Sequence, residues 1–117
     1  MTEQEKKILL IDLCARLPYH PKVRVKVEGI EYDDWWTMAT IQELGRVQYT
    51  CLPFLRPMSS MTEEELEEYA DKLMPLAKAN FDYIGHFDWL NAHHFDYRGL
   101  IPMGLAIEVT KENNPYE

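Results

Sequence analysis

Three histidines in the second half of the sequence are the residues whose types and spacing first suggest chemistry. His86, His93 and His94 fall within nine residues. Three carboxylates lie near them in the sequence, at Asp82, Asp88 and Asp96. On one helix, however, His86 and His93 are about two turns, or roughly 10 Å, apart along the axis. Zinc–nitrogen bonds of about 2 Å cannot bridge that distance around one ion, so we expect no metal site and no other cofactor.

An enzymatic function is the alternative hypothesis. In that case the fold would bring one of these histidines together with Asp88 or Asp96, in a small hydrolase or a metal-dependent enzyme. The sequence contains no HExxH spacing, no glycine-rich phosphate loop and no GxSxG nucleophile motif. Because these motifs are absent, a protein without catalytic residues is the preferred prediction.

Two adjacent tryptophans and a row of cations suggest a protein interface instead. Neighbouring residues of a strand point to opposite faces, so of Trp35 and Trp36 one should enter the core and the other should lie at the surface. Lys22, Arg24 and Lys26 alternate along a preceding strand and form a basic row on its polar face. If the two strands pair, one indole shares that face. We therefore predict a binding surface made of these five residues.

The partner of this surface is predicted to be a second copy of the chain or an unknown protein. A partner that fits would offer an apolar pocket rimmed with carboxylates. The alternative, which we favour for the cations themselves, is that the basic row pairs across the sheet with Glu31, Asp33 or Glu43.

The two cysteines are expected to be buried free thiols. Cys14 and Cys51 have apolar neighbours and no metal-type spacing, and two thiols do not make a disulfide framework. We expect Cys14 on the buried face of the first helix, beside Leu10 and Leu17, where its thiol would be unreactive.

The elements that would position these residues begin with a helix over residues 2–17. Thr2 and Glu5 have the spacing of a capping box at its start. The apolar positions that define a broad buried face are Ile8, Leu10, Ile11, Leu13, Cys14, Ala15 and Leu17. A strand over residues 7–12 is the competing prediction.

Three strands follow in the sequence. Residues 22–28 alternate valine with charged residues, which is typical of a strand with one buried face. A second strand is predicted over residues 31–42, a turn at Glu43–Gly45 and a third strand over Arg46–Leu52. Together they predict an antiparallel meander.

The second half of the chain is predicted to be mainly helical. A loop lies between Pro53 and Pro57, and Thr62 with Glu65 forms a second capping box. The apolar side of the helix that follows is made of Leu66, Tyr69, Ala70 and Leu73, and Met61 should pack on Leu66. A further helix is predicted over residues 83–95. After a turn at Asp96–Gly99, a last strand is expected over Leu105–Val109 and a frayed tail from about residue 110.

These elements predict one α+β domain over residues 1–117. Its sheet should be a meander of three or four antiparallel strands, and about three helices should pack against it.

The composition restricts the partners of this domain. Twelve lysines and arginines stand against twenty aspartates and glutamates, which gives a formal net charge of −8. That charge disfavours general binding to nucleic acid or to anionic lipid, and an acidic helix that mimics nucleic acid is a minor alternative. The longest apolar run near the start, Ile8–Ile11, has only four residues, so no segment is predicted to enter a membrane and a cytoplasmic location is expected.

Four stretches of the sequence are similar to known proteins of unknown activity. They are DLCARLPY (12–19), LRPMSSMTEEELEEY (55–69), WLNAHHFDYRGLI (89–101) and GLAIE (104–108). In this order they resemble a group of small uncharacterised proteins of gut Bacteroidetes and their phages or prophages, and they cover somewhat over a third of the chain. The resemblance implies an intracellular accessory protein of phage or other mobile-element origin. It implies no catalytic residue.

Overall fold

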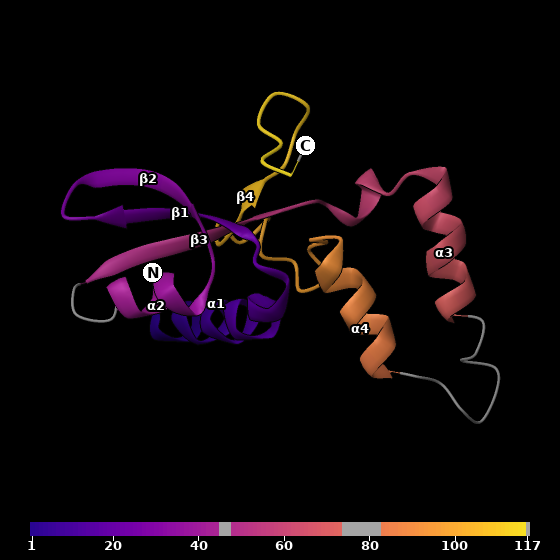
Figure 1. Ribbon diagram of the computed structural model, residues 1–117, viewed down its shortest axis with the longest axis horizontal. Coiled ribbons are helices and arrows are strands. Elements are labelled where there is room, and N and C mark those ends of the chain that lie inside the picture. Colours follow the sequence, from indigo (N-terminus) through magenta and orange to yellow (C-terminus); the bar gives the residue numbers. More distant parts are fainter. Residues whose placement is uncertain (45–47, 74–82, 117) are drawn as a thin grey trace.

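The computed structural model describes residues 1–44, 48–73 and 83–116. In these ranges the chain forms an α+β fold (Figure 1). The α-helices are α1 (Glu3–Arg16), α2 (Met38–Leu44), α3 (Glu63–Leu73) and α4 (Tyr83–Ala92). The strands are β1 (Lys22–Val27), β2 (Ile30–Trp35), β3 (Tyr49–Leu55) and β4 (Ile107–Glu108). Short 3₁₀ helices cover Leu17–Tyr19 and Met58–Ser60.

The sheet is not a meander, because its strand order is β2-β1-β3-β4. β1 lies between β2 and β3 and is antiparallel to both, as the three predicted strands were expected to be. β4 is parallel to β3, which makes the sheet mixed. The order differs from the prediction because α2 follows β2 and carries the chain beneath the sheet, so that β3 enters on the other side of β1 (Figure 1).

The second predicted strand ends earlier than expected. β2 stops at Trp35, and residues 38–42, predicted as strand, belong to α2. The reason lies in Thr37, whose side-chain oxygen accepts the backbone N–H of Thr40 at 3.2 Å and so caps the start of the helix. β-branched residues favour strands, but a threonine at this position serves equally well as an N-cap.

The third strand begins and ends three residues later than predicted, since it covers Tyr49–Leu55 rather than Arg46–Leu52. Arg46 and the predicted turn glycine, Gly45, lie outside the described residues. Pro53, expected in a loop, is a buried strand residue opposite Val23. Proline is tolerated there because β4 pairs only with Phe54 and Leu55 and leaves that side of Pro53 without a strand neighbour.

Helix α1 confirms the first predicted helix, and its capping box between Thr2 and Glu5 is formed. The competing prediction of a strand was wrong. The predicted buried face was right only in part. Leu13 is buried, and Ile8 and Leu17 are partly buried against the core, but the other buried residues of the helix are Leu9, Asp12 and Arg16. Leu9 and Leu13 join the valines of β1 in the main core, whereas Leu10, Ile11 and Cys14 are exposed.

Helices α3 and α4 form a second part of the molecule, to one side of the sheet (Figure 1). The capping box of α3 is formed as predicted, with Thr62 Oγ1 accepting the N–H of Glu65 at 3.1 Å. Where α4 meets the rest of the chain, Trp89, Leu90 and Phe95 make a separate small core. The whole molecule measures 50 × 31 × 26 Å, and this elongation leaves both parts with extensive surface.

Helix α4 ends at Ala92, three residues before the predicted end. The N–H of Phe95 donates to Leu90 O at 3.0 Å, and that of His94 donates to Asn91 O at 3.0 Å. This pair of bonds is the Schellman motif, in which the penultimate residue adopts a left-handed conformation. His94 does so, with φ 62°.

Candidate functional site

The two tryptophans of the predicted interface lie on opposite sides of the sheet, as expected. Trp36 is only 3% exposed, and its indole N–H donates to Leu13 O at 2.9 Å, which ties α1 to the sheet. Trp35 is 43% exposed. Trp36 is therefore a core residue, and the surface that we predicted retains Trp35 with the three cations of β1.

Two of the three cations of this surface have partners within the chain. Lys22 lies opposite Trp35 in the sheet, and its ammonium group is 4.3 Å from the indole centroid. Arg24 Nε lies 2.9 Å from a carboxylate oxygen of Asp33 and 3.7 Å from one of Glu31. The favoured prediction of pairing across the sheet is thus confirmed for Arg24. Lys26 is exposed and stands opposite Glu31 in the register.

The end of the chain borders the same surface. The tail that was expected to fray is anchored to the sheet through Tyr116. Its hydroxyl accepts the backbone N–H of Lys22 at 3.0 Å and donates to Phe54 O at 2.7 Å. The Tyr116 ring also lies 6.4 Å from that of Trp35. Dimerisation through Trp35 stays a prediction, but the tail and the ion pairs of Arg24 already occupy part of this surface.

The three histidines of the second half of the chain each pack against a different aromatic ring. His93 stacks on Trp89 with ring centroids 4.2 Å apart, and His94 stacks on Tyr116 at 3.8 Å. His86 lies 5.3 Å from the ring of Tyr69. These contacts give the imidazoles a role in packing.

The carboxylates that the enzyme hypothesis requires are also in use. Both oxygens of Asp96 accept backbone N–H groups, from Leu100 at 2.8 Å and from Ile101 at 2.9 Å. A hydrogen bond to Asp88, together with burial, raises the pKa of Tyr19 to about 12. Asp82 lies outside the described residues. Among the residues that are described, no group of three or more His, Cys, Asp or Glu side chains could hold a metal ion.

His94 differs from the other histidines in its surroundings. Burial, followed by the nearby charge of Arg16, lowers the pKa of its imidazole to about 4. Its Nδ1 atom is buried, and no described residue hydrogen-bonds to it. The ring is therefore neutral at ordinary pH and acts as an apolar surface for Tyr116.

A buried ionic cluster lies at the C-terminal end of α1 and was not predicted from the sequence. Arg16 and Asp12 are both fully buried, with Arg16 Nε 2.8 Å from a carboxylate oxygen of Asp12. The other oxygen accepts from Arg98 at 2.9 Å, and Arg16 donates to Phe95 O at 2.6 Å. The signal was present in the sequence, because Asp12 and Arg16 are four residues apart and so share one face of the helix. The cluster fastens α1 to the segment that follows α4.

A second ion pair holds the start of α3. The guanidinium of Arg56 makes two bonds of 2.7 Å to the carboxylate of Glu65, the residue that also completes the capping box. Arg56 lowers the pKa of Glu65 to about 2. This bidentate pair fixes α3 relative to the end of β3.

The side of α1 that points away from the core exposes apolar residues. Lys7, Leu10, Ile11 and Cys14 follow one another at the i, i+3, i+4, i+7 spacing of a helical stripe, and we call them the outer face of α1. Leu10 is 59% exposed and Ile11 54%. Cys14, predicted to be buried, is exposed, whereas Cys51 is buried as predicted and burial raises the pKa of its thiol to about 12.

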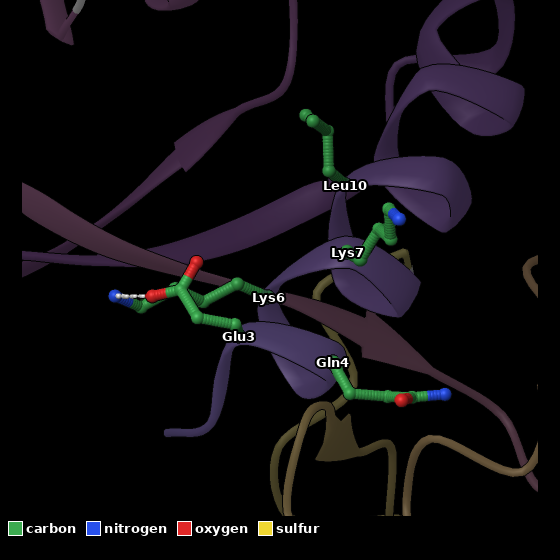
Figure 2. Close-up of a pocket in the computed structure, with 5 residues that line it drawn as sticks. All are labelled: Glu3, Gln4, Lys6, Lys7 and Leu10. Carbon is green, nitrogen blue, oxygen red and sulfur yellow. Dashed lines mark hydrogen bonds and ion pairs between the residues drawn. The ribbon is translucent and has the colours of Figure 1, made fainter.

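A shallow hollow lies beside this face at the start of α1. Figure 2 shows the side chains that line it, which are Glu3, Gln4, Lys6, Lys7 and Leu10. Lys6 and Glu3 form an exposed ion pair at 3.4 Å, and Lys7 and Leu10 project from the helix without contacting that pair (Figure 2). The hollow thus combines an apolar wall with a cation.

Helix α3 presents a surface of the opposite charge. Glu63, Leu66, Glu67 and Ala70 have the same stripe spacing and are all exposed; we call them the acidic-apolar face of α3. Leu66 is 56% exposed. The other side of α3 faces α4, where Glu68 accepts the indole N–H of Trp89 at 3.0 Å. The predicted apolar side of α3 is therefore only partly covered.

Comparison with known proteins gives no match to a family model, to a curated protein or to a solved structure. None of the described helices is long and apolar enough to cross a membrane.

Proposed function

We propose that the chain is a non-enzymatic interaction protein that acts in the cytoplasm, in keeping with the phage-related proteins that its sequence resembles. The observation that carries this proposal is the outer face of α1, where Leu10 and Ile11 are each more than half exposed. Isolated apolar residues at a surface are ordinary, but apolar residues in a helical stripe are typical of a binding surface.

The arrangement of the ionisable groups supports the same proposal. The histidines that an enzyme would use are packed on aromatic rings, and Asp96 is occupied by two backbone N–H groups. A general acid or base needs free access to its substrate. These groups contribute to the stability of the fold instead.

Affinity capture from the native cells tests this function. The tagged wild-type chain is compared with the variant Ile11→Glu, which places a charge in the stripe, and captured proteins are quantified by mass spectrometry. We expect specific partners to be retained by the wild type and lost from the variant.

The matched control is Lys111→Glu, at an exposed position in the tail and away from α1. It should retain the partners of the wild type. Identical captured sets from the wild type and Ile11→Glu, with both folded, would show that the outer face of α1 binds nothing and would contradict the proposal.

A further inference from the structure

The partner of the outer face of α1 can be named from the chemistry of the chain itself. We propose that this face binds the acidic-apolar face of α3 from a second copy of the same chain. The inference rests on the proposed function, since it identifies the partner of the same surface.

The first step is the distribution of apolar residues around α1. Its inner side buries Leu9 and Leu13 in the main core, while Leu10 and Ile11 occupy the opposite side. Two large apolar side chains that lie together in a helical stripe at the surface are typical of a contact with another molecule. The described residues of the chain leave Leu10 and Ile11 more than half exposed, so this stripe is available to a second molecule.

The second step is the charge of that face. Lys7 lies in the stripe beside Leu10, and it forms no ion pair with any residue that the structure describes. The neighbouring Lys6 holds Glu3 only through an exposed contact of 3.4 Å. A partner that fits would place an apolar side chain over Leu10 and Ile11 and a carboxylate near Lys7.

The acidic-apolar face of α3 has this composition. Leu66 and Ala70 supply the apolar contacts, and Glu63 and Glu67 supply carboxylates that pair with no described residue. Both faces extend over two helical turns with residues at i, i+3, i+4 and i+7. Two helices packed along such stripes bring one lysine of α1 within reach of the glutamates of α3.

The two helices lie in separate parts of the molecule (Figure 1), and both faces are exposed in the single chain. α1 lies under the sheet and α3 lies at the far end of the molecule (Figure 1). Two copies related by a twofold axis would therefore form the α1–α3 contact twice. The net charge of −8 opposes association at long range, but at physiological ionic strength it is screened beyond about 8 Å, so the local contacts decide.

Charge exchange between the two faces is the decisive experiment. Analytical ultracentrifugation of the full chain should show reversible dimers for the wild type. Lys7→Glu or Glu67→Lys alone should weaken dimerisation by about tenfold or more, because each places like charges together in the contact. An equimolar mixture of the two variants should dimerise again, since one new contact has its charges exchanged and the other is that of the wild type.

The controls are Lys111→Glu and Glu112→Lys, which make the same changes of charge in the exposed tail. They should leave the dimer unchanged. A wild type that stays monomeric at the highest concentration overturns the inference. So does a dimer that is insensitive to both exchanges, or a mixture that fails to restore association.

Labelling of Cys14 in the wild-type chain gives a second test that needs no substitution. Cys14 is exposed in the stripe, while Cys51 is buried and its raised pKa suppresses the reactive thiolate. The rate at which a thiol reagent modifies Cys14 should fall as protein concentration rises through the range of dimerisation. A rate that is the same in monomer and dimer would place the contact elsewhere.

The outcomes also separate this inference from the proposed function. A monomeric chain that loses a different captured protein on Ile11→Glu would overturn the second copy as the partner while supporting an interaction function. A chain that neither dimerises nor depends on Ile11 for capture would overturn both.

Discussion

The imidazole of His94 lies flat against the phenol ring of Tyr116, with the centroids 3.8 Å apart and the planes 6° apart. This contact joins the end of α4 to the last residues of the chain. It also explains why a histidine occupies a left-handed position where glycine is usual, because the side chain provides the surface on which the tail is held.

Replacement of the Tyr116 hydroxyl should destabilise the fold. Tyr116→Phe keeps the ring but removes the bonds to Lys22 N and Phe54 O, and it leaves the N–H of Lys22 without its partner. We expect the free energy of unfolding to decrease by about 1–3 kcal/mol in urea melts. Lys111→Ala, a change at an exposed position of the tail, should cost less. Equal losses for the two variants would contradict the role of the hydroxyl.

The free energy of unfolding should decrease as the pH falls, because the unfolded chain protonates His94 more readily than the folded protein does. Its pKa is about 4 in the folded protein and ordinarily 6.5, so the unfolded chain binds the proton more readily. The contribution of the neutral ring is fully present above pH 6.5 and is lost progressively as the pH falls toward 4. For the wild type, the free energy of unfolding measured at several pH values in this window should decrease with falling pH, and this dependence is the slope to be compared.

The variant His94→Gly tests the origin of that slope. Glycine adopts the left-handed conformation readily, so the Schellman motif should persist while the titrating group is removed. The slope between pH 6.5 and 4 should become shallower, whereas His20→Gln, a change at an exposed histidine, should retain more of it. An unchanged slope in His94→Gly would assign the acid sensitivity to other groups.

The start of α3 should depend on its N-cap. Thr62→Ala removes the acceptor for the N–H of Glu65, and we expect a loss of about 1 kcal/mol in denaturant melts. Ser59→Ala, three residues earlier at an exposed position, serves as the matched control. A loss below about 0.3 kcal/mol for Thr62→Ala would mean that this cap contributes little.

Sequence patterns correctly predicted the features that depend on residues close together in the sequence. Both capping boxes, at Thr2 and Thr62, could be predicted because the threonine that accepts and the glutamate whose N–H donates are only three residues apart. The alternation of the β1 residues predicted its buried valines. One buried and one exposed tryptophan followed in the same way from the geometry of a strand.

The predictions that failed concern features that depend on contacts between residues far apart in the sequence. The buried side of α1 was misplaced because it includes Asp12 and Arg16, whose burial depends on Phe95 and Arg98 some eighty residues away. No local sequence pattern shows that Phe95 and Arg98 are the partners of these two residues. The same holds for Tyr116, whose anchoring groups lie on β1 and β3. On the outer face of α1, Leu10, Ile11 and Cys14 were predicted to be buried but are exposed, since a sequence does not show whether other parts of the chain cover an apolar stripe.

The buried cluster of Asp12 and Arg16 supplies a test of how its two charges depend on each other. Asp12→Ala removes the carboxylate and leaves Arg16, which is fully buried, with an uncompensated charge. Breaking a buried pair in this way costs about 3–5 kcal/mol. The double variant Asp12→Leu with Arg16→Met removes both charges and fills similar space, so it should be more stable in urea melts than Asp12→Ala. If the double variant is the less stable of the two, the cluster stabilises the fold through the contact of Arg16 with Phe95 O and the ring of Tyr97 rather than through charge compensation.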